Sequence, residues 1–464
     1  MPKTRKAKPA RVQPVLNPHA AGADIGAREI YVAVSADAAD APVRRFETFT
    51  EDLRKLVAWL QEHGVTTVAM EATSVYWIPL AELLEEAGVE VCLVNPRHVK
   101  NVPGRKTDVA DCQWLQYLHS VGLLRAAFRP AAHVRGVRAL WRHRDALVRH
   151  SAWHIQHMHK ALDQMNLQIH HVIADLTGKS GTDIVEAILA GQREPAALAA
   201  LGDKRLKASK ATLCAALTGD YREEHLFCLR QAYEGHGFVV RQIAEVDKKI
   251  AGVLAALEPA EIKPEAAAQT ATEGETGAKT KGKPRSGGAN RHQPAYDVRG
   301  ELLRHLGVDL TTIPGINVTT AQTLWAELGG DLGAFRSGKH FASWLSLCPD
   351  NRVSGGKLLS AHTKPSANRA ARALRLAAQG LHHAKNELGE FYRRMRGKLG
   401  GAAALVATAH KLARIVYAVL STKQPYRPQL HAQAEQRRLA RTLKQLRSKA
   451  ETLGFQLTPI QQTA

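Results

Sequence analysis

AGADIGAREIYVAVSAD, residues 21–37, is the stretch of sequence that decides the fold. Its apolar and β-branched residues alternate with small or polar ones, which is typical of a strand with one face in a core. Further along, RRFETFT at 44–50 can pair beside it, and EDLRKLVAWLQEHG at 51–64 has helical periodicity and a terminal glycine. The fold therefore begins with strands followed by a helix.

The same alternation continues to about residue 130. VTTVAMEAT at 65–73 and VEVCLVNP at 89–96 are two further apolar strand candidates, and the helix candidate YWIPLAELLEEAG at 76–88 separates them. Another helix follows from residue 111. Strands that alternate with helices predict an α/β domain with a mixed sheet over residues 20–130.

The remaining sequence divides by composition. Residues 131–258 are almost wholly helical in pattern, and their long basic segments predict a helical or coiled-coil middle region. Residues 259–297 have almost no large apolar side chains and predict a disordered linker or insertion. A second, mainly α domain is expected at 298–420. Basic tails are expected at 1–19 and 421–464.

Charge points to the class of partner. Lysine and arginine number 64 against 43 aspartates and glutamates, a formal charge of +21, which favours a polyanion. Nucleic acid is favoured over a membrane because no run of about 18 apolar residues is present. The basic N-terminus lacks the apolar core of a signal peptide, so we expect a cytoplasmic protein. Five scattered cysteines favour reduced thiols over disulfides or a zinc site.

Four carboxylates stand out. Asp24 falls within the first strand candidate, Glu71 near the end of the second, and Asp108 and Asp111 lie three apart at the start of the helix after the third. Acids inside apolar strands are costly unless they are compensated. The helix pair alone also fits ordinary first-turn acids that complement the helix dipole. Together the four favour two Mg²⁺ or Mn²⁺ ions, as in RNase H-like folds, because these ions prefer hard oxygen ligands.

The motifs GADIG, MEAT, VNP and KTDVAD at these intervals resemble the DEDD insertion-sequence transposases, the insertion-sequence one-ten family with the Piv invertases. LTGKSG, ILAGQREP and RLKASKATLCAALTG also look like one subgroup of these enzymes. The resemblance implies an RNase H-like first domain similar to the RuvC Holliday-junction resolvase. It further implies that Asp24, Glu71, Asp108 and Asp111 form a metal-binding tetrad.

RVSGGK at 352–357 matches the family's serine motif, and the resemblance implies that Ser354 is a nucleophile. By itself an S-G-G stretch is more often only a turn, and no neighbouring residue supplies a base. The surroundings are basic, and the glycines allow the backbone to approach a phosphate closely. The nucleic-acid-binding candidates are Arg105, Lys106, Arg352, Gly355, Gly356, Lys357, Lys364, Arg369 and Arg372.

TIPGINVTTAQTLWAELGG at 312–330 resembles a helix-hairpin-helix motif, in which backbone N–H groups of the turn meet a phosphate. Family members usually carry a second glycine where this chain has Asn317. Asn tolerates left-handed dihedral angles, so we expect the turn to survive, and phosphate contact there is left open. A simple packing turn is the alternative.

Histidines offer a competing site. His143, His150, His154 and His157 fall on one stripe of a basic helix, and pairs spaced four apart can bind zinc. No cysteine or carboxylate completes a coordination set, so a stripe rich in Arg and His is expected to face phosphates instead.

Together with the carboxylates, the resemblance implies a transposase, acting at the bacterial nucleoid, that cleaves and rejoins DNA through two metal ions held by the tetrad and a covalent phosphoserine at Ser354. The resemblance implies a composite site between protomers, a tetramer formed as a dimer of dimers, and a noncoding bridge RNA that selects target and donor. Two alternatives stay open. One is a metal-dependent junction nuclease in which Ser354 is a turn residue, and the other is a nucleic-acid-binding protein without catalysis.

Overall fold

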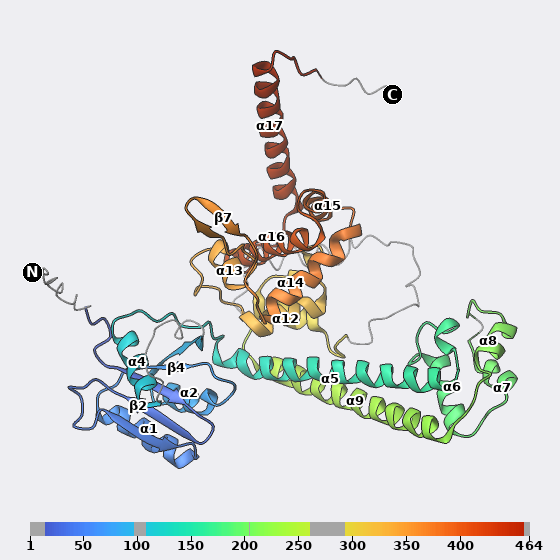
Figure 1. Ribbon diagram of the computed structural model, residues 1–464, viewed down its shortest axis with the longest axis horizontal. Helices are drawn as coiled ribbons and strands as arrows, with labels where there is room; N and C mark the ends of the chain where they lie inside the picture. Colours follow the sequence, from blue (N-terminus) through green and yellow to red (C-terminus); the bar gives the residue numbers. More distant parts are fainter. Residues whose placement is uncertain (1–13, 97–107, 204, 260–292, 459–464) are drawn as a thin grey trace, which may run out of the picture. The chain divides into compact units, whose positions relative to one another are not determined.

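The computed structural model describes residues 14–96, 108–203, 205–259 and 293–458. The chain forms two compact units, Met1–Arg129 and Pro130–Ala464, each of which is described by itself (Figure 1). Most of the predicted linker at 259–297 and the basic loop before Asp108 lie outside the described residues. The finer domain division stays a prediction.

In its described residues, the first unit is a five-stranded mixed sheet with helices on both faces. Its elements are β1 (Ala20–Ile25), β2 (Glu29–Ala33), β3 (Val43–Glu47), α1 (Thr50–Glu62), β4 (Thr67–Glu71), α2 (Trp77–Glu86), β5 (Glu90–Val94) and α4 (Asp108–Ser120). The strand order is β3-β2-β1-β4-β5, with β1, β4 and β5 parallel and β2 antiparallel to its two neighbours. The predicted mixed α/β sheet is confirmed.

The opening stretch 21–37 is a hairpin rather than one strand. β1 ends at Ile25, where the Gly26 N–H donates to the Glu29 carbonyl at 2.9 Å, and β2 then pairs antiparallel with β1. The connection at residues 26–28 contains one glycine but no Asn-Gly or Asp-Gly pair, the strongest short-range sign of a hairpin turn. The apolar periodicity alone therefore predicts one continuous strand where the structure has two.

Different helices cover the two faces of the sheet. On one face, α1 and α2 pack against alternate residues of β1 and β4 and bury four leucines completely: Leu56, Leu60, Leu80 and Leu84. On the other face, Leu115 of α4 packs against Ala69, Cys92 and Val94. Both faces are therefore covered by apolar contacts, and α4 is the helix that carries the predicted aspartate pair.

The second unit is mainly helical, as predicted for the C-terminal region. Its longer helices are α5 (Ala132–Gln164), α6 (Lys179–Leu189), α9 (Glu223–Ala256), α11 (Val298–Leu306), α12 (Val318–Leu328), α14 (Arg369–Gly380), α15 (Glu387–Leu399), α16 (Gly401–Thr422) and α17 (Pro428–Thr452). The shorter elements are α7 (Pro195–Ala200), α8 (Lys210–Ala216), α13 (Gly338–Trp344), the 3-10 turns Ile169–His171, Leu310–Thr312 and Leu381–His383, and the hairpin of β6 (Arg352–Ser354) and β7 (Lys357–Ser360).

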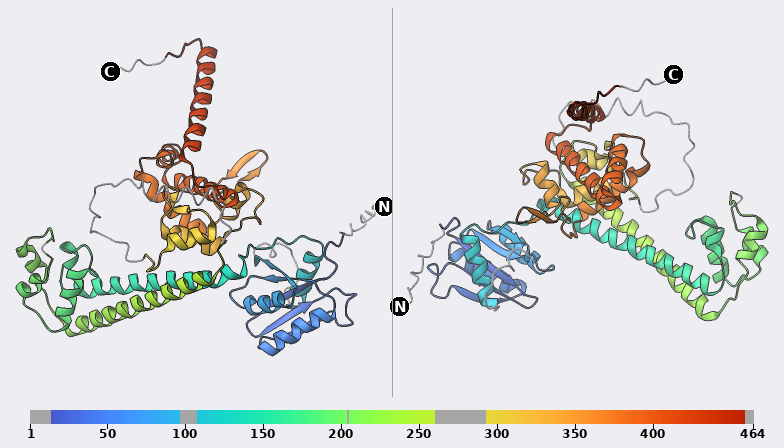
Figure 2. Two further views of the ribbon diagram at one scale, coloured as in Figure 1. Left: turned by 180° about the vertical axis from the view of Figure 1, so that it is seen from behind. Right: turned by 45° about the horizontal axis from the view of Figure 1, so that its top comes forward.

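Helices α5 and α9 lie side by side and run antiparallel, which both views show (Figures 1 and 2). Between them Arg144 and Asp247 form a buried ion pair, with Arg144 Nη2 3.1 Å from Asp247 Oδ2 and side chains only 3% and 4% exposed. The Ala295 N–H donates to the same Oδ2 at 3.1 Å. A buried carboxylate needs such partners, because an uncompensated charge in a core is costly.

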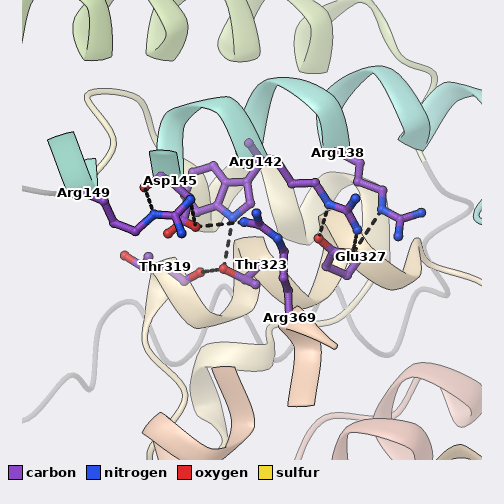
Figure 3. A network of polar contacts seen from close by, with 9 residues as sticks. Arg138, Arg142, Asp145, Arg149, Thr319, Thr323, Glu327 and Arg369 are labelled. Carbon is purple, nitrogen blue, oxygen red and sulfur yellow. Dashed lines mark hydrogen bonds and ion pairs between the residues drawn. The ribbon is translucent and has the colours of Figure 1, made fainter. Parts of the chain in front are cut away.

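A polar network joins α5 to α12 (Figure 3). Glu327, whose side chain is 5% exposed, accepts hydrogen bonds from Arg142 at 2.8 and 2.7 Å and from Arg138 at 3.0 Å. Between these contacts, the Trp141 indole donates to the Thr323 hydroxyl at 3.0 Å. The long helix pair and the domain that carries Ser354 are thus held together by charge-assisted bonds, which are stronger than neutral ones.

The helix α16 lies at the centre of this second domain, packed by α13, α14 and α15. It is the one described helix that is long and apolar enough to cross a membrane by length and composition, and half of its apolar window is buried inside the fold. Three charged or ionisable residues interrupt its apolar sequence: His410, Lys411 and Arg414. Its packing is that of a core helix.

Replacement of Asp247 tests the buried ion pair. We expect Asp247→Ala to lower the free energy of unfolding by about 3–5 kcal/mol, because the Arg144 charge would stay buried without its partner. The matched control is Glu245→Gln, an exposed acid on the same helix, which should change stability by less than about 0.5 kcal/mol. Urea unfolding followed by circular dichroism measures both, and equal effects would contradict the assigned role of the pair.

Candidate active site

The strands β1 and β4 place two of the predicted carboxylates at one edge of the sheet. Their parallel register pairs Ala23 with Met70, so Asp24 and Glu71 each follow that pair by one residue. Side chains alternate along a strand, and Ala23 and Met70 face the α1–α2 core, so Asp24 and Glu71 belong to the opposite face. Both carboxylates are half-buried there.

Helix α4 lies on this face in direct backbone contact with β1. A Cβ added to Gly22 would come within 2.3 Å of the Gln116 nitrogen and 2.4 Å of the Cys112 carbonyl oxygen, so only glycine fits. The His119 ring hydrogen-bonds the Thr67 hydroxyl at 2.9 Å, which ties the same helix to β4. Because α4 begins at Asp108, this packing brings the start of the helix to the edge where Asp24 and Glu71 lie.

The thiol of Cys112 reports how close two of the carboxylates are. Burial, followed by the negative charge of Asp24 and to a smaller extent that of Asp111, the preceding residue in the chain, raises its pKa to about 12. One side chain on α4 is therefore within electrostatic range of an acid on β1 and of an acid on its own helix. The arrangement gathers negative charge at this edge, which a bound cation would offset.

The donors suit a hard divalent cation, since all of the predicted ligands are carboxylates. Within the described part of the chain, no group of three or more His, Cys, Asp or Glu is placed to hold a metal ion. The side chain of Asp108 lies outside that description, as do Arg105 and Lys106. Asp24, Glu71 and Asp111 thus do not form a closed ligand set by themselves, and the tetrad stays a prediction.

Ser354 lies at the tip of an exposed hairpin. It ends β6 and pairs directly with Lys357, the first residue of β7. Gly355 and Gly356 between them have φ of 54° and 76°, the positive pair that a two-residue type I′ turn requires. Directly opposite residues share a face of the ribbon, so the Ser354 hydroxyl and the Lys357 side chain lie on the same side.

The other predicted phosphate ligands are spread over several contacts. Lys364 pairs with Asp350 at 3.5 Å, and Arg369 donates to Asp145 of α5 at 2.8 Å (Figure 3). Arg372 is exposed on α14, and the side chain of Arg352 lies outside the described part. Arg369 is thus engaged within the chain, and a phosphate would have to compete with Asp145 for it.

The turn at residues 314–316, Pro-Gly-Ile (the PGI turn), owes its shape to packing and to helix capping. Gly315 has φ of 92°, and a Cβ there would come within 2.9 Å of the Ala377 carbonyl of α14. Asn317 is extended, with φ of −91° and ψ of 173°, and its side chain accepts from the Thr320 N–H at 2.8 Å. The turn survives with Asn317, as expected, but left-handed dihedral angles are not the reason, because Asn317 acts as an N-cap in the extended region. Phosphate contact at this turn stays a prediction.

The histidine stripe on α5 faces more than one way. His154 lies against α9, where a Cβ on Gly235 would come within 2.3 Å of its ring, and His157 packs on Trp153 with ring centroids 3.9 Å apart. His143 and His150 are exposed. The described residues offer no metal cluster here either.

The sequence analysis missed the residues that join the domain carrying Ser354 to the pair of long helices, α5 and α9. Glu327 and its partners Arg138 and Arg142 are more than 180 residues apart. One sign was present, since Glu327 lies in the apolar run LWAEL at 324–328 and would be costly there without a partner.

Comparison with known families supplies the identity. Residues 21–167 match a model for the DEDD transposases of the IS110 kind, described as a transposase. Residues 309–393 match a second model, described as the transposase IS116/IS110/IS902 family, and together the two matches cover half of the chain. The chain belongs to the IS110 family of transposases. No curated protein matches it.

Membership makes this protein a DNA transposase, an enzyme that acts on DNA. The first match spans β1, β4 and α4 and so includes every carboxylate of the predicted tetrad, and the mixed sheet is consistent with an RNase H-like DEDD domain. The second match includes Ser354 and the PGI turn. The predicted family and enzyme class are confirmed.

The Gly22 contact yields a structural prediction. We expect Gly22→Ala to lower the free energy of unfolding by about 3 kcal/mol, the upper end for overpacking, because the new methyl group would meet backbone atoms of α4. The matched control is Gly136→Ala on α5, where a Cβ meets nothing within 4 Å, and it should stabilise by about 0.5–1 kcal/mol. If urea unfolding gave Gly22→Ala the stability of the wild type, α4 could not lie this close to β1.

Proposed function

We propose that this transposase cleaves and rejoins DNA with a carboxylate tetrad, Asp24, Glu71, Asp108 and Asp111, and with Ser354 as the nucleophile. The observation that carries the proposal is the position of Asp24 and Glu71 on adjacent parallel strands, beside a helix that begins at Asp108. The negative charge of Asp24 also acts on the buried Cys112 thiol of α4, which supports placing this acid beside the helix.

The tetrad would hold two Mg²⁺ or Mn²⁺ ions. Carboxylate oxygens are the ligands that these ions prefer, and the repulsion between neighbouring carboxylates favours a cation between them. When bound, the ions would stabilise the attacking and leaving oxygens at the scissile phosphate.

Ser354 would form the covalent intermediate. A bond forms between its Oγ and phosphorus while the bond from phosphorus to the departing sugar oxygen breaks, and that oxygen gains the proton that the serine loses. The number of phosphate ester bonds is unchanged, so a second hydroxyl can reverse the step and rejoin the strand. Lys357, directly opposite Ser354 across the turn, would supply positive charge to the phosphate.

The partners follow from charge and family. We include DNA ends and target DNA as substrates, a noncoding bridge RNA as guide, and a tetramer built as a dimer of dimers. The net charge of +21 supports a large polyanionic ligand. Three apolar side chains exposed on the serine hairpin, Val353, Leu358 and Leu359, support contact with another macromolecule when the protein assembles.

The carboxylates are tested by charge-neutral replacement. Asp24→Asn or Asp111→Asn should abolish strand cleavage, while the fold stays intact or gains slight stability because repulsion is relieved. Glu47→Gln, an exposed acid on β3 with the same change of charge, should cleave as the wild type does. Cleavage of a labelled element end is measured with EDTA and with Mg²⁺ restored. Full cleavage by either Asn variant would refute the tetrad.

The nucleophile is tested by trapping the adduct. Ser354→Ala should bind DNA normally and yet give no denaturant-resistant protein–DNA complex, since its oxygen is needed only when phosphorus is attacked. Ser360→Ala in the same hairpin is the control. Adducts at the wild-type level in Ser354→Ala would exclude this serine, and strand cleavage without any adduct in the wild type would favour the junction nuclease.

The same assay examines assembly. A mixture of Asp108→Asn and Ser354→Ala should regain part of the activity if the acids of one protomer work with the serine of another. No rescue, despite mixed oligomers shown by tagged copurification, would place both groups in one chain.

A further inference from the structure

A cavity of about 910 Å³ lies in the second unit between α15, α16 and the segment that follows α16. This volume falls near the upper end of the range of about 300–1,000 Å³ that is usual for small-ligand pockets. None of the carboxylates proposed for catalysis lines it, and neither does Ser354. The cavity is therefore a separate feature from the proposed chemistry.

One side of α16 forms the floor. Ala407, Ile415, Ala418 and Val419 give it an apolar surface, and the helical spacing of three and four places Lys411 and Arg414 on the same side. Tyr426 and Phe391 add aromatic surface from the flanking segments. The lining thus combines apolar and aromatic area with positive charge. No acid is among its residues, although Glu387 of α15 lies within electrostatic range of Tyr426.

The three cations of the lining are held in different ways. Lys411 Nζ lies 4.5 Å from the centroid of the Phe391 ring, a cation–π contact that holds the ammonium in place. Arg427 donates to Gln424 at 3.2 Å, a neutral partner that leaves its charge uncompensated. Arg414 is exposed, and none of the described residues forms a hydrogen bond or an ion pair with it.

The two other titratable groups of the lining, His410 and Tyr426, are neutral and contribute hydrogen-bonding atoms rather than charge. Burial and the nearby Arg414 lower the pKa of His410, so its imidazole is neutral at pH 7. Burial, and after it the negative charge of Glu387 on α15, raises the pKa of Tyr426 to about 12, so its hydroxyl stays neutral. The ligand that suits this lining is an anion with a flat, largely apolar body and hydrogen-bonding edges.

We propose that the cavity binds one nucleotide of a single-stranded nucleic acid, with its phosphate against Arg414 and Lys411 and its base on the apolar floor beside Tyr426. This class of ligand rests on the DNA-acting function proposed above. A base in a duplex is covered by its stacked neighbours, whereas an unpaired base can enter a pocket and place its face on an apolar or aromatic surface. DNA and RNA share this chemistry, so the source is decided by experiment.

Fluorescence anisotropy of the full-length protein tests the proposal. The probes are an oligothymidylate of about ten nucleotides, within the usual range of single-strand site sizes, its ribonucleotide counterpart, and an abasic strand of equal length. The wild type should bind the base-bearing strands about tenfold more tightly than the abasic one. Equal affinity for the abasic strand would overturn the nucleotide assignment. Whichever of the DNA and RNA probes binds more tightly identifies the natural ligand as DNA or RNA.

Two matched pairs of variants place the binding in the cavity. Ala418→Glu puts a negative, bulkier side chain on the floor, and Ala403→Glu makes the same change at an exposed position of α16 outside the cavity. Arg414→Gln removes the exposed cation, and Arg336→Gln removes an exposed arginine elsewhere in this unit. We expect the first member of each pair to weaken binding about tenfold relative to its control.

Salt dependence gives a second readout. Loss of one phosphate contact should make the slope of log affinity against log salt shallower by about 0.7 in Arg414→Gln only. All four positions are on the surface, so melting temperatures should match the wild type. If both cavity variants bind like their controls, the proposal is wrong. Strand cleavage by the wild type is scored separately, so a failure of this site is distinguishable from a failure of the serine and carboxylate chemistry.

Discussion

The first unit depends on one close approach, between the backbone of β1 at Gly22 and the backbone of α4 at Cys112 and Gln116. Two backbones can lie this close only where one of them carries no side chain. This contact fixes how far α4 sits above the sheet, and so fixes the distance between an acid on a strand and the acids at the start of a helix. A residue with no functional group thereby sets the geometry of the candidate metal site.

The second unit relies instead on buried charge. Arg144, Asp247 and Glu327 are ionised groups in buried positions, and Glu327 is reached by two partly exposed arginines, Arg138 and Arg142. Buried ion pairs of this kind often add little net stability compared with apolar replacements, but a mispaired arrangement would leave a charge without a partner. We therefore infer that these ion pairs select the packing arrangement. They favour a single alignment of α5 with α9 and a single position of α12 on α5.

Much of the fold was readable from sequence because it depends on local pattern. The alternation of apolar residues gave the strands and helices of the mixed sheet, and the Gly-Gly pair after Ser354 marked a turn. The break of 21–37 into two strands was missed because a single glycine, Gly26, marks it, without the Asn-Gly or Asp-Gly pair that would have signalled a hairpin. The turn at Asn317 was expected to survive, but its N-cap role was missed because capping and left-handed turns attract the same residue type.

The site was less readable, because its contacts join distant parts of the chain. Arg369 was expected to face a phosphate, and its pairing with Asp145 spans 224 residues. Sequence spacing cannot show such a partner. The relative positions of Asp24 and Glu71 were easier to predict. Parallel strands bring their carboxyl ends to one edge of a sheet, whatever the length of chain between them.

The hairpin that carries Ser354 has a consequence for the tolerance of this enzyme to change. Exposed loops usually accept insertions and deletions without harm. Here the two glycines fix which residues lie opposite each other, and in a ribbon a slip of one residue turns every side chain of that strand to the other face. A single residue added to or removed from this turn would thus point the serine away from Lys357 while hardly disturbing the rest of the domain. The loop is open to solvent, and yet its length is as constrained as that of a core element.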